Sequence, residues 1–122
     1  MREIDKVRQP YNIPVPSQQG AVFVLRELAG EVARIRDVVV AERARLGAGL
    51  VKLGFTVSKS DANFLWVESP TSAPALHARL SERGVLVKYF QGSAGRMANR
   101  MRITVGLPGE NDRLLAEIAA GA

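Results

Sequence analysis

The sequence of 122 residues contains no cysteine, which excludes disulfide frameworks, thiolate metal sites and cysteine nucleophiles. It also lacks an apolar run of the roughly 20 residues that a membrane-spanning helix needs. Residues 1–6 are mostly charged and contain no apolar stretch like the core of a signal peptide. We therefore expect a cytoplasmic protein with no membrane partner.

Aromatic residues are scarce, at 6%, although the chain is basic, with 17 lysines and arginines against 12 acidic residues. An excess of basic residues is compatible with binding to nucleic acid, to anionic lipid or to a small anionic ligand. Nucleic-acid binding usually combines clustered basic residues with aromatic side chains that stack on bases. Here the basic residues are dispersed, so we expect no nucleic-acid partner.

Metal ligands and catalytic groups are also sparse. His77 is the single histidine and has no second metal-type ligand at helical spacing, so we expect no metal site. Residues 58–61 combine hydroxyls, a lysine and a carboxylate, but a polar turn explains them better than a nucleophile without a nearby base. The chain thus holds no self-sufficient catalytic set, and we assign no catalytic residue in it.

Apolar residues make up 47% of the chain, enough for one domain with a single core. Three prolines within residues 7–18 predict an extended connector, because proline fixes φ and disfavours helix in the preceding residue. We therefore divide the chain into a connector, residues 1–17, and a domain, residues 18–122. A short helix is expected over residues 18–27, with Ser17 as its cap.

The strongest helical pattern covers residues 31–53. Apolar side chains there recur at spacings of three, four or seven, which predicts one buried face comprising Val32, Ile35, Val39, Leu46, Leu50 and Leu53. Charged side chains fall elsewhere around this helix, among them Arg34, Arg36, Asp37, Glu42 and Arg45. Gly54 is the predicted stop.

Beyond Gly54 the pattern alternates between strands and helices. Strands are predicted over residues 55–57, 63–67, 85–88 and 101–105, and helices over residues 73–83 and from about 108 onward. Phe64 and Trp66 are interpreted as core and interface residues. This order predicts an α+β fold, a small, mostly antiparallel sheet with helices packed on one face.

Arg102 is the most informative polar residue. Met101, Ile103 and Val105 point to one face of their strand, whereas Arg102 and Thr104 point to the other. A guanidinium fork suits a carboxylate or phosphate, but a solvent-facing arginine or an internal ion pair remains an alternative. Lys88, at a strand end, could neutralise an anion, and the glycine-containing loop 91–96 is better explained as a flexible connection than as a phosphate cradle.

Four segments together resemble the histidinol-phosphate aminotransferase family. They are KVRQPYN (residues 6–12), SDANFLWV (60–67), GVLVK (84–88) and MRITVGLPGEND (101–112). Each is modest alone, but their order and distances match the family. The resemblance covers essentially the whole chain and about the final third of the family's length.

The resemblance implies the C-terminal small domain of a fold-type I, pyridoxal-phosphate-dependent aminotransferase, which exchanges the amino group between histidinol phosphate and 2-oxoglutarate in histidine biosynthesis. It implies that Arg102 binds the carboxylate or other anionic group of the substrate. Lys88 stands where the family has an arginine for the phosphate end, which keeps the charge and loses the fork. A substrate-binding role for Tyr11 is implied as well.

The resemblance also implies what lies elsewhere. The Schiff-base lysine and the groups that hold the cofactor belong to a large domain outside these residues, so we expect the chain alone neither to hold pyridoxal phosphate stably nor to transaminate. Family members are homodimers when complete. The alternatives are a stand-alone ferredoxin-like module for a small anion or a partner protein, and a basic nucleic-acid-binding domain.

Overall fold

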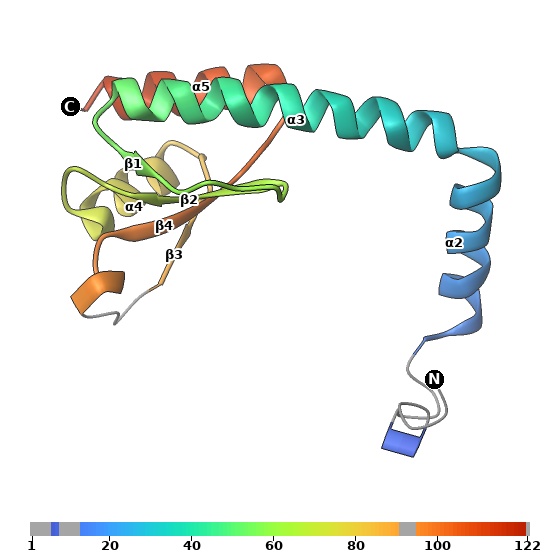
Figure 1. Ribbon diagram of the computed structural model, residues 1–122. Coiled ribbons are helices and arrows are strands. Elements are labelled where there is room, and N and C mark those ends of the chain that lie inside the picture. Colours follow the sequence, from blue (N-terminus) through green and yellow to red (C-terminus); the bar gives the residue numbers. More distant parts are fainter. Residues whose placement is uncertain (1–5, 8–12, 91–94, 122) are drawn as a thin grey trace. The chain divides into compact units, whose positions relative to one another are not determined.

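The computed structural model describes residues 6–7, 13–90 and 95–121. The chain divides into two compact units, Met1–Arg36 and Asp37–Ala122, which are described separately; the boundary in the sequence falls within helix α3 (Ala29–Lys52). Figure 1 shows the elements in chain order. The division into a connector of residues 1–17 and a domain of residues 18–122 stays a prediction.

The first unit contains helix α2 (Val15–Glu27), which begins three residues earlier than the pattern predicts. Pro14 precedes the helix and Pro16 lies in its first turn. The N–H groups of a first turn have no acceptor within the helix, so the N–H that proline lacks removes no helical hydrogen bond. The expected cap by Ser17 is wrong, because no side chain caps this helix. No residue of α2 is buried.

The predicted long helix is confirmed as α3, but only part of its apolar stripe is buried. Leu46 and Leu50 are fully buried in the second unit. Val32 and Ile35 belong to the first unit, and their side chains remain 48% and 50% exposed. Gly54 ends this segment with φ of +85°, a conformation that side chains with a Cβ rarely adopt.

The second unit is built on a four-stranded sheet in the order β1-β2-β4-β3, with every pair antiparallel. The strands are β1 (Thr56–Val57), β2 (Phe64–Glu68), β3 (Lys88–Tyr89) and β4 (Arg100–Thr104). The central pair, β2 and β4, contributes Leu65, Val67, Met101 and Ile103 to the core. The antiparallel sheet of the sequence prediction is confirmed.

Helices cover one face of this sheet (Figure 1). The core joins the inward residues of β2 and β4 to apolar side chains of α3, α4 (Ala73–Glu82) and α5 (Pro108–Ala119). Burial alternates along both central strands, so the opposite face carries the half-buried and exposed side chains. The predicted α+β class with helices on one face is therefore confirmed.

Two local predictions differ from the structure. The strand expected over residues 85–88 is shortened to Lys88 and Tyr89, and Leu86 before it is 83% exposed. Val85 instead contacts the C-terminal end of α4, where its N–H donates a hydrogen bond to the carbonyl of Leu80 at 2.8 Å. Phe64 and Trp66 are not core residues, because Leu65 and Val67 occupy the inward positions of β2.

Candidate functional site

Arg102 lies in the middle of the sheet face that the helices leave uncovered. It is paired in register with Trp66 of β2 on one side and with Lys88 of β3 on the other. Residues directly opposite each other in an antiparallel pair project to the same face. The fold therefore places Arg102 and Lys88, the two predicted anion-binding residues in the described part of the chain, on neighbouring strands and on one face.

Aromatic rings lie beside both cations. The guanidinium carbon of Arg102 is 5.5 Å from the centre of the Phe64 ring, and Nζ of Lys88 is 5.6 Å from that of Phe90. The Phe90 ring in turn lies 5.3 Å from Trp66. A ring attracts a cation through its face without occupying the N–H donors. We call these five residues, Phe64, Trp66, Lys88, Phe90 and Arg102, the cationic face.

Neither cation has an acidic partner among residues 6–7, 13–90 and 95–121, whereas neighbouring arginines do. Arg100, two residues earlier on β4, contacts the Glu68 carboxylate at 2.8 Å, and Arg83 contacts Glu117 at the same distance. The side chains of Arg102 and Lys88 are exposed. Their donors can therefore meet an incoming carboxylate or phosphate without first breaking an ion pair of the described residues.

A buried polar cluster supports the turn that follows β4. Asn111, only 2% exposed, donates to the Gly106 carbonyl at 2.9 Å and accepts from the Gly106 N–H at 3.0 Å. It also donates to the Glu42 carboxylate of α3 at 2.8 Å. Hydrogen bonds from Arg45 and from Asn111 hold the pKa of Glu42 below its ordinary value of 4.5. The cluster ties the end of the Arg102 strand to two helices.

The pattern of the sequence does not predict this cluster. The helical pattern assigns Glu42 to the polar side of its helix, but the residue is 8% exposed. Charged residues on an amphipathic helix are usually solvated, but Glu42 contacts Asn111, which is 69 positions away in the sequence, as well as Arg45 on its own helix. No local signal identifies such a pair.

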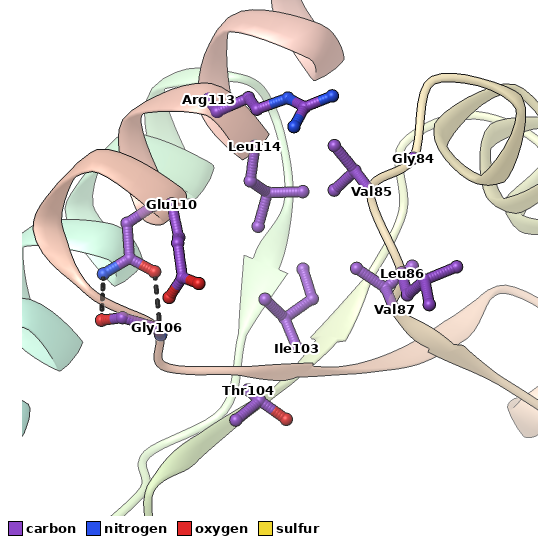
Figure 2. A pocket seen from close by; sticks show the side chains of 11 residues that line it. Gly84, Val85, Leu86, Val87, Ile103, Thr104, Gly106, Glu110, Arg113 and Leu114 are labelled. Carbon is purple, nitrogen blue, oxygen red and sulfur yellow. Dashed lines mark hydrogen bonds between the residues drawn. The ribbon is translucent and has the colours of Figure 1, made fainter.

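A pocket of about 310 Å³ lies between the segment before β3 and the start of α5 (Figure 2). Val85, Ile103 and Leu114 form apolar walls. Its charged residues have other partners: Glu110 accepts from the N–H of Leu107 at 2.7 Å, and Arg113 donates to the Arg83 carbonyl at 2.6 Å. The cationic face, rather than this pocket, offers unpaired donors to an anion.

Comparison with known proteins identifies the family. The family model for aminotransferase class I and II matches residues 1–118 of the chain. The chain belongs to this aminotransferase family.

The curated relatives agree with this assignment. The chain is 45% identical to a histidinol-phosphate aminotransferase of Methylibium petroleiphilum over 95% of its own length and 31% of the relative's. It is 42% identical to histidinol-phosphate aminotransferase 1 of Carboxydothermus hydrogenoformans, over 97% of the chain and 33% of that protein. The chain thus spans about a third of the length of the curated relatives it matches.

Solved structures agree on the fold. The crystal structure of the histidinol-phosphate aminotransferase from Clostridium acetobutylicum matches 98% of this chain and 36% of its own, with a TM-score of 0.81 and 20% identity. The one from Sinorhizobium meliloti, solved in complex with pyridoxal-5'-phosphate, matches 99% of this chain and 34% of its own, with a TM-score of 0.77 and 21% identity. At these identities the likeness concerns the fold.

Aminotransferases of this family use pyridoxal phosphate, which requires an enclosed lysine amine for its Schiff base. The chain has four lysines, Lys6, Lys52, Lys59 and Lys88, and all four are exposed. The described residues therefore enclose no amine of this kind by themselves.

The other predicted positions are not among the five residues of the cationic face. Tyr11 lies outside the described residues, as do positions 91–94 of the glycine-containing loop. His77 lies with its ring centre 5.8 Å from that of Tyr89, and the described part of the chain contains no group of three potential metal ligands. None of the described helices is long and apolar enough to cross a membrane.

Proposed function

We propose that this chain is the C-terminal part of a pyridoxal-phosphate-dependent aminotransferase, a histidinol-phosphate transaminase, in which Arg102 binds the anionic group of each substrate. The observation that carries the proposal is the exposed guanidinium of Arg102, which has no acidic partner among the described residues and lies beside Lys88. The names of the relatives that match nearly the whole chain supply the reaction and the substrate.

Arg102 meets a chemical requirement of this reaction. The two partners exchange one amino group but differ in their anions, since histidinol phosphate carries a phosphate and 2-oxoglutarate carries carboxylates. A guanidinium fork forms two parallel hydrogen bonds with either group. One arginine on a rigid central strand can therefore position both substrates in turn, while the cofactor supplies the electron sink.

Lys88 has the second role in the proposal. An ammonium group is a compact charge that binds phosphate without the planar fork of arginine. Its position opposite Arg102 in the register supports a contact with the phosphate of histidinol phosphate, and Tyr11 is included as a further substrate-binding residue. With lysine at this position, we expect the site to discriminate less sharply between phosphate and other anions than it would with arginine.

The cofactor-holding groups, including the Schiff-base lysine, are proposed to lie in a large domain of the same protein, outside this chain. In that arrangement residues 1–17 connect the large domain to a small domain of residues 18–122, and the complete protein is a cytoplasmic homodimer. The share of the relatives that this chain spans, about a third, leaves room for such a domain.

The test is steady-state kinetics of the complete enzyme. Arg102→Ala should raise KM for histidinol phosphate and for 2-oxoglutarate by roughly 10- to 150-fold, the value of a hydrogen-bonded charge contact. Lys88→Ala should raise KM for histidinol phosphate but leave that for 2-oxoglutarate unchanged. Arg100→Ala, in which the arginine already bound to Glu68 is removed, is the matched control. Unchanged KM values in Arg102→Ala would refute the proposal.

A further inference from the structure

Arg102 has a neighbour that the reaction chemistry does not require, and this neighbour is aromatic. The Phe64 ring lies 5.5 Å from the guanidinium carbon, within the range of a cation–π contact. In the register Phe64 pairs with Thr104, so it is diagonal to Arg102 on the same face of the sheet. Diagonal neighbours in antiparallel strands lie within reach of aromatic and long side chains.

An exposed arginine side chain samples many rotamers, and holding it in one costs conformational entropy when a ligand binds. An acidic partner would hold the guanidinium but would also occupy the donors that the substrate needs. A ring fixes the position of the guanidinium plane and leaves its N–H groups available. Phe64 itself is half-buried and lies in β2, where it is paired with Thr104 of β4.

We infer that Phe64 is a positioning residue, which holds the Arg102 guanidinium in its substrate-binding orientation before the substrate arrives. The inference rests on the proposed role of Arg102 as the anion-binding residue. Phe64 itself touches no reacting atom. Its contribution is to reduce the freedom that Arg102 loses on binding, so it acts on substrate affinity.

The variants follow from this role. Phe64→Leu keeps an apolar side chain of similar size and removes the ring face, so KM for both anionic substrates should rise about two- to five-fold with little change in kcat. Phe64→Tyr keeps the ring and should restore the wild-type KM. The matched control is Phe55→Leu, because Phe55 is 4% exposed in the core of the same unit, away from the cationic face. This control should lower the melting temperature and leave KM unchanged.

The decisive measurement is a double-mutant cycle in the complete enzyme. In an Arg102→Ala background, Phe64→Leu should have no further effect on KM, because the ring then has no guanidinium to hold. An equal rise in KM with and without Arg102 would overturn the inference, as would an unchanged KM in Phe64→Leu alone. Failure of the proposed function has a different signature, since there Arg102→Ala itself leaves KM unaltered.

Discussion

The two faces of the sheet have opposite characters although they are made by the same strands. The inner face, formed by Leu65, Val67, Met101 and Ile103, is almost completely buried against three helices. The cationic face carries two exposed cations with aromatic neighbours and no acidic partners among the described residues. One residue step along β4 thus separates positions that stabilise the fold from positions available to a ligand.

This contrast explains how a small domain can present a charged site on a rigid support. Burial of the inner face stabilises the fold, so Arg102 and Lys88 are not required to form ion pairs within the protein. Arg100, at the edge of that face, shows the alternative, because its contact with Glu68 satisfies the guanidinium inside the protein. The difference between Arg100 and Arg102 is therefore the physical basis for assigning ligand binding to one of them.

The largest expected effect comes from changing neighbouring residues on opposite faces of β4. Ile103 is 1% exposed, so Ile103→Ala should lower the free energy of unfolding by about 2–5 kcal/mol through lost burial and the cavity left behind. Thr104→Ala, one position on, should change it by no more than about 0.5 kcal/mol. Urea denaturation of the purified chain measures both. Similar losses in the two variants would show that the faces do not differ in this way.

A second prediction concerns Glu42, a buried charged residue on the side of the sheet that is otherwise mostly apolar. Its pKa is held below the unfolded value, so the charged carboxylate stabilises the fold above that value and this contribution disappears as the pH falls through the folded pKa. The free energy of unfolding should therefore decrease below about pH 4.5, and the decrease should be smaller in Glu42→Gln. Glutamine has no proton to gain, yet it fills the same space.

The control for this measurement is Glu31→Gln. Glu31 also has a lowered pKa, from its hydrogen bond with Arg34, but it lies on the exposed surface of the first unit. Replacing it should alter the pH dependence less than Glu42→Gln does, because exposed ion pairs contribute little. Identical pH profiles in wild type and Glu42→Gln would show that the buried cluster does not contribute to stability through its charge.

The sequence predicts most of the fold because its alternation is local. Residues 101–105 show a period of two, and this pattern alone identifies both the inward Ile103 and the outward Arg102. The same rule places Phe64 and Trp66 on one face of their strand and Leu65 and Val67 on the other, but it does not identify which of the two faces is buried, and the interpretation of Phe64 and Trp66 as core residues is wrong. Their outward positions follow from Leu65 and Val67 once β2 is paired with β4.

Other features could not be predicted from local pattern. Glu42 is buried where α5 brings Asn111 to its carboxylate, a contact between residues far apart in the sequence. The segment before Lys88 is rich in β-branched residues, yet only two residues pair with β4, and Val85 serves the end of α4 instead. Likewise, the pairing of Lys88 with Arg102 depends on strand register, which no single strand encodes.

The smallest effect is expected from adding pyridoxal phosphate to the chain alone. The chain is mixed with pyridoxal phosphate, and borohydride then reduces any Schiff base to a stable adduct. If the cationic face binds anions but encloses no amine, the adducts should be distributed over the four exposed lysines, Lys6, Lys52, Lys59 and Lys88, with no preferred position. Peptide mapping by mass spectrometry measures the distribution, and Lys88→Arg should reduce the total only by the share of one site. One equivalent of cofactor on a single lysine, lost on replacing that lysine, would mean that the described residues form a cofactor site after all. The anion-binding and cofactor-holding functions would then share this chain, and the proposed division between two domains would be wrong.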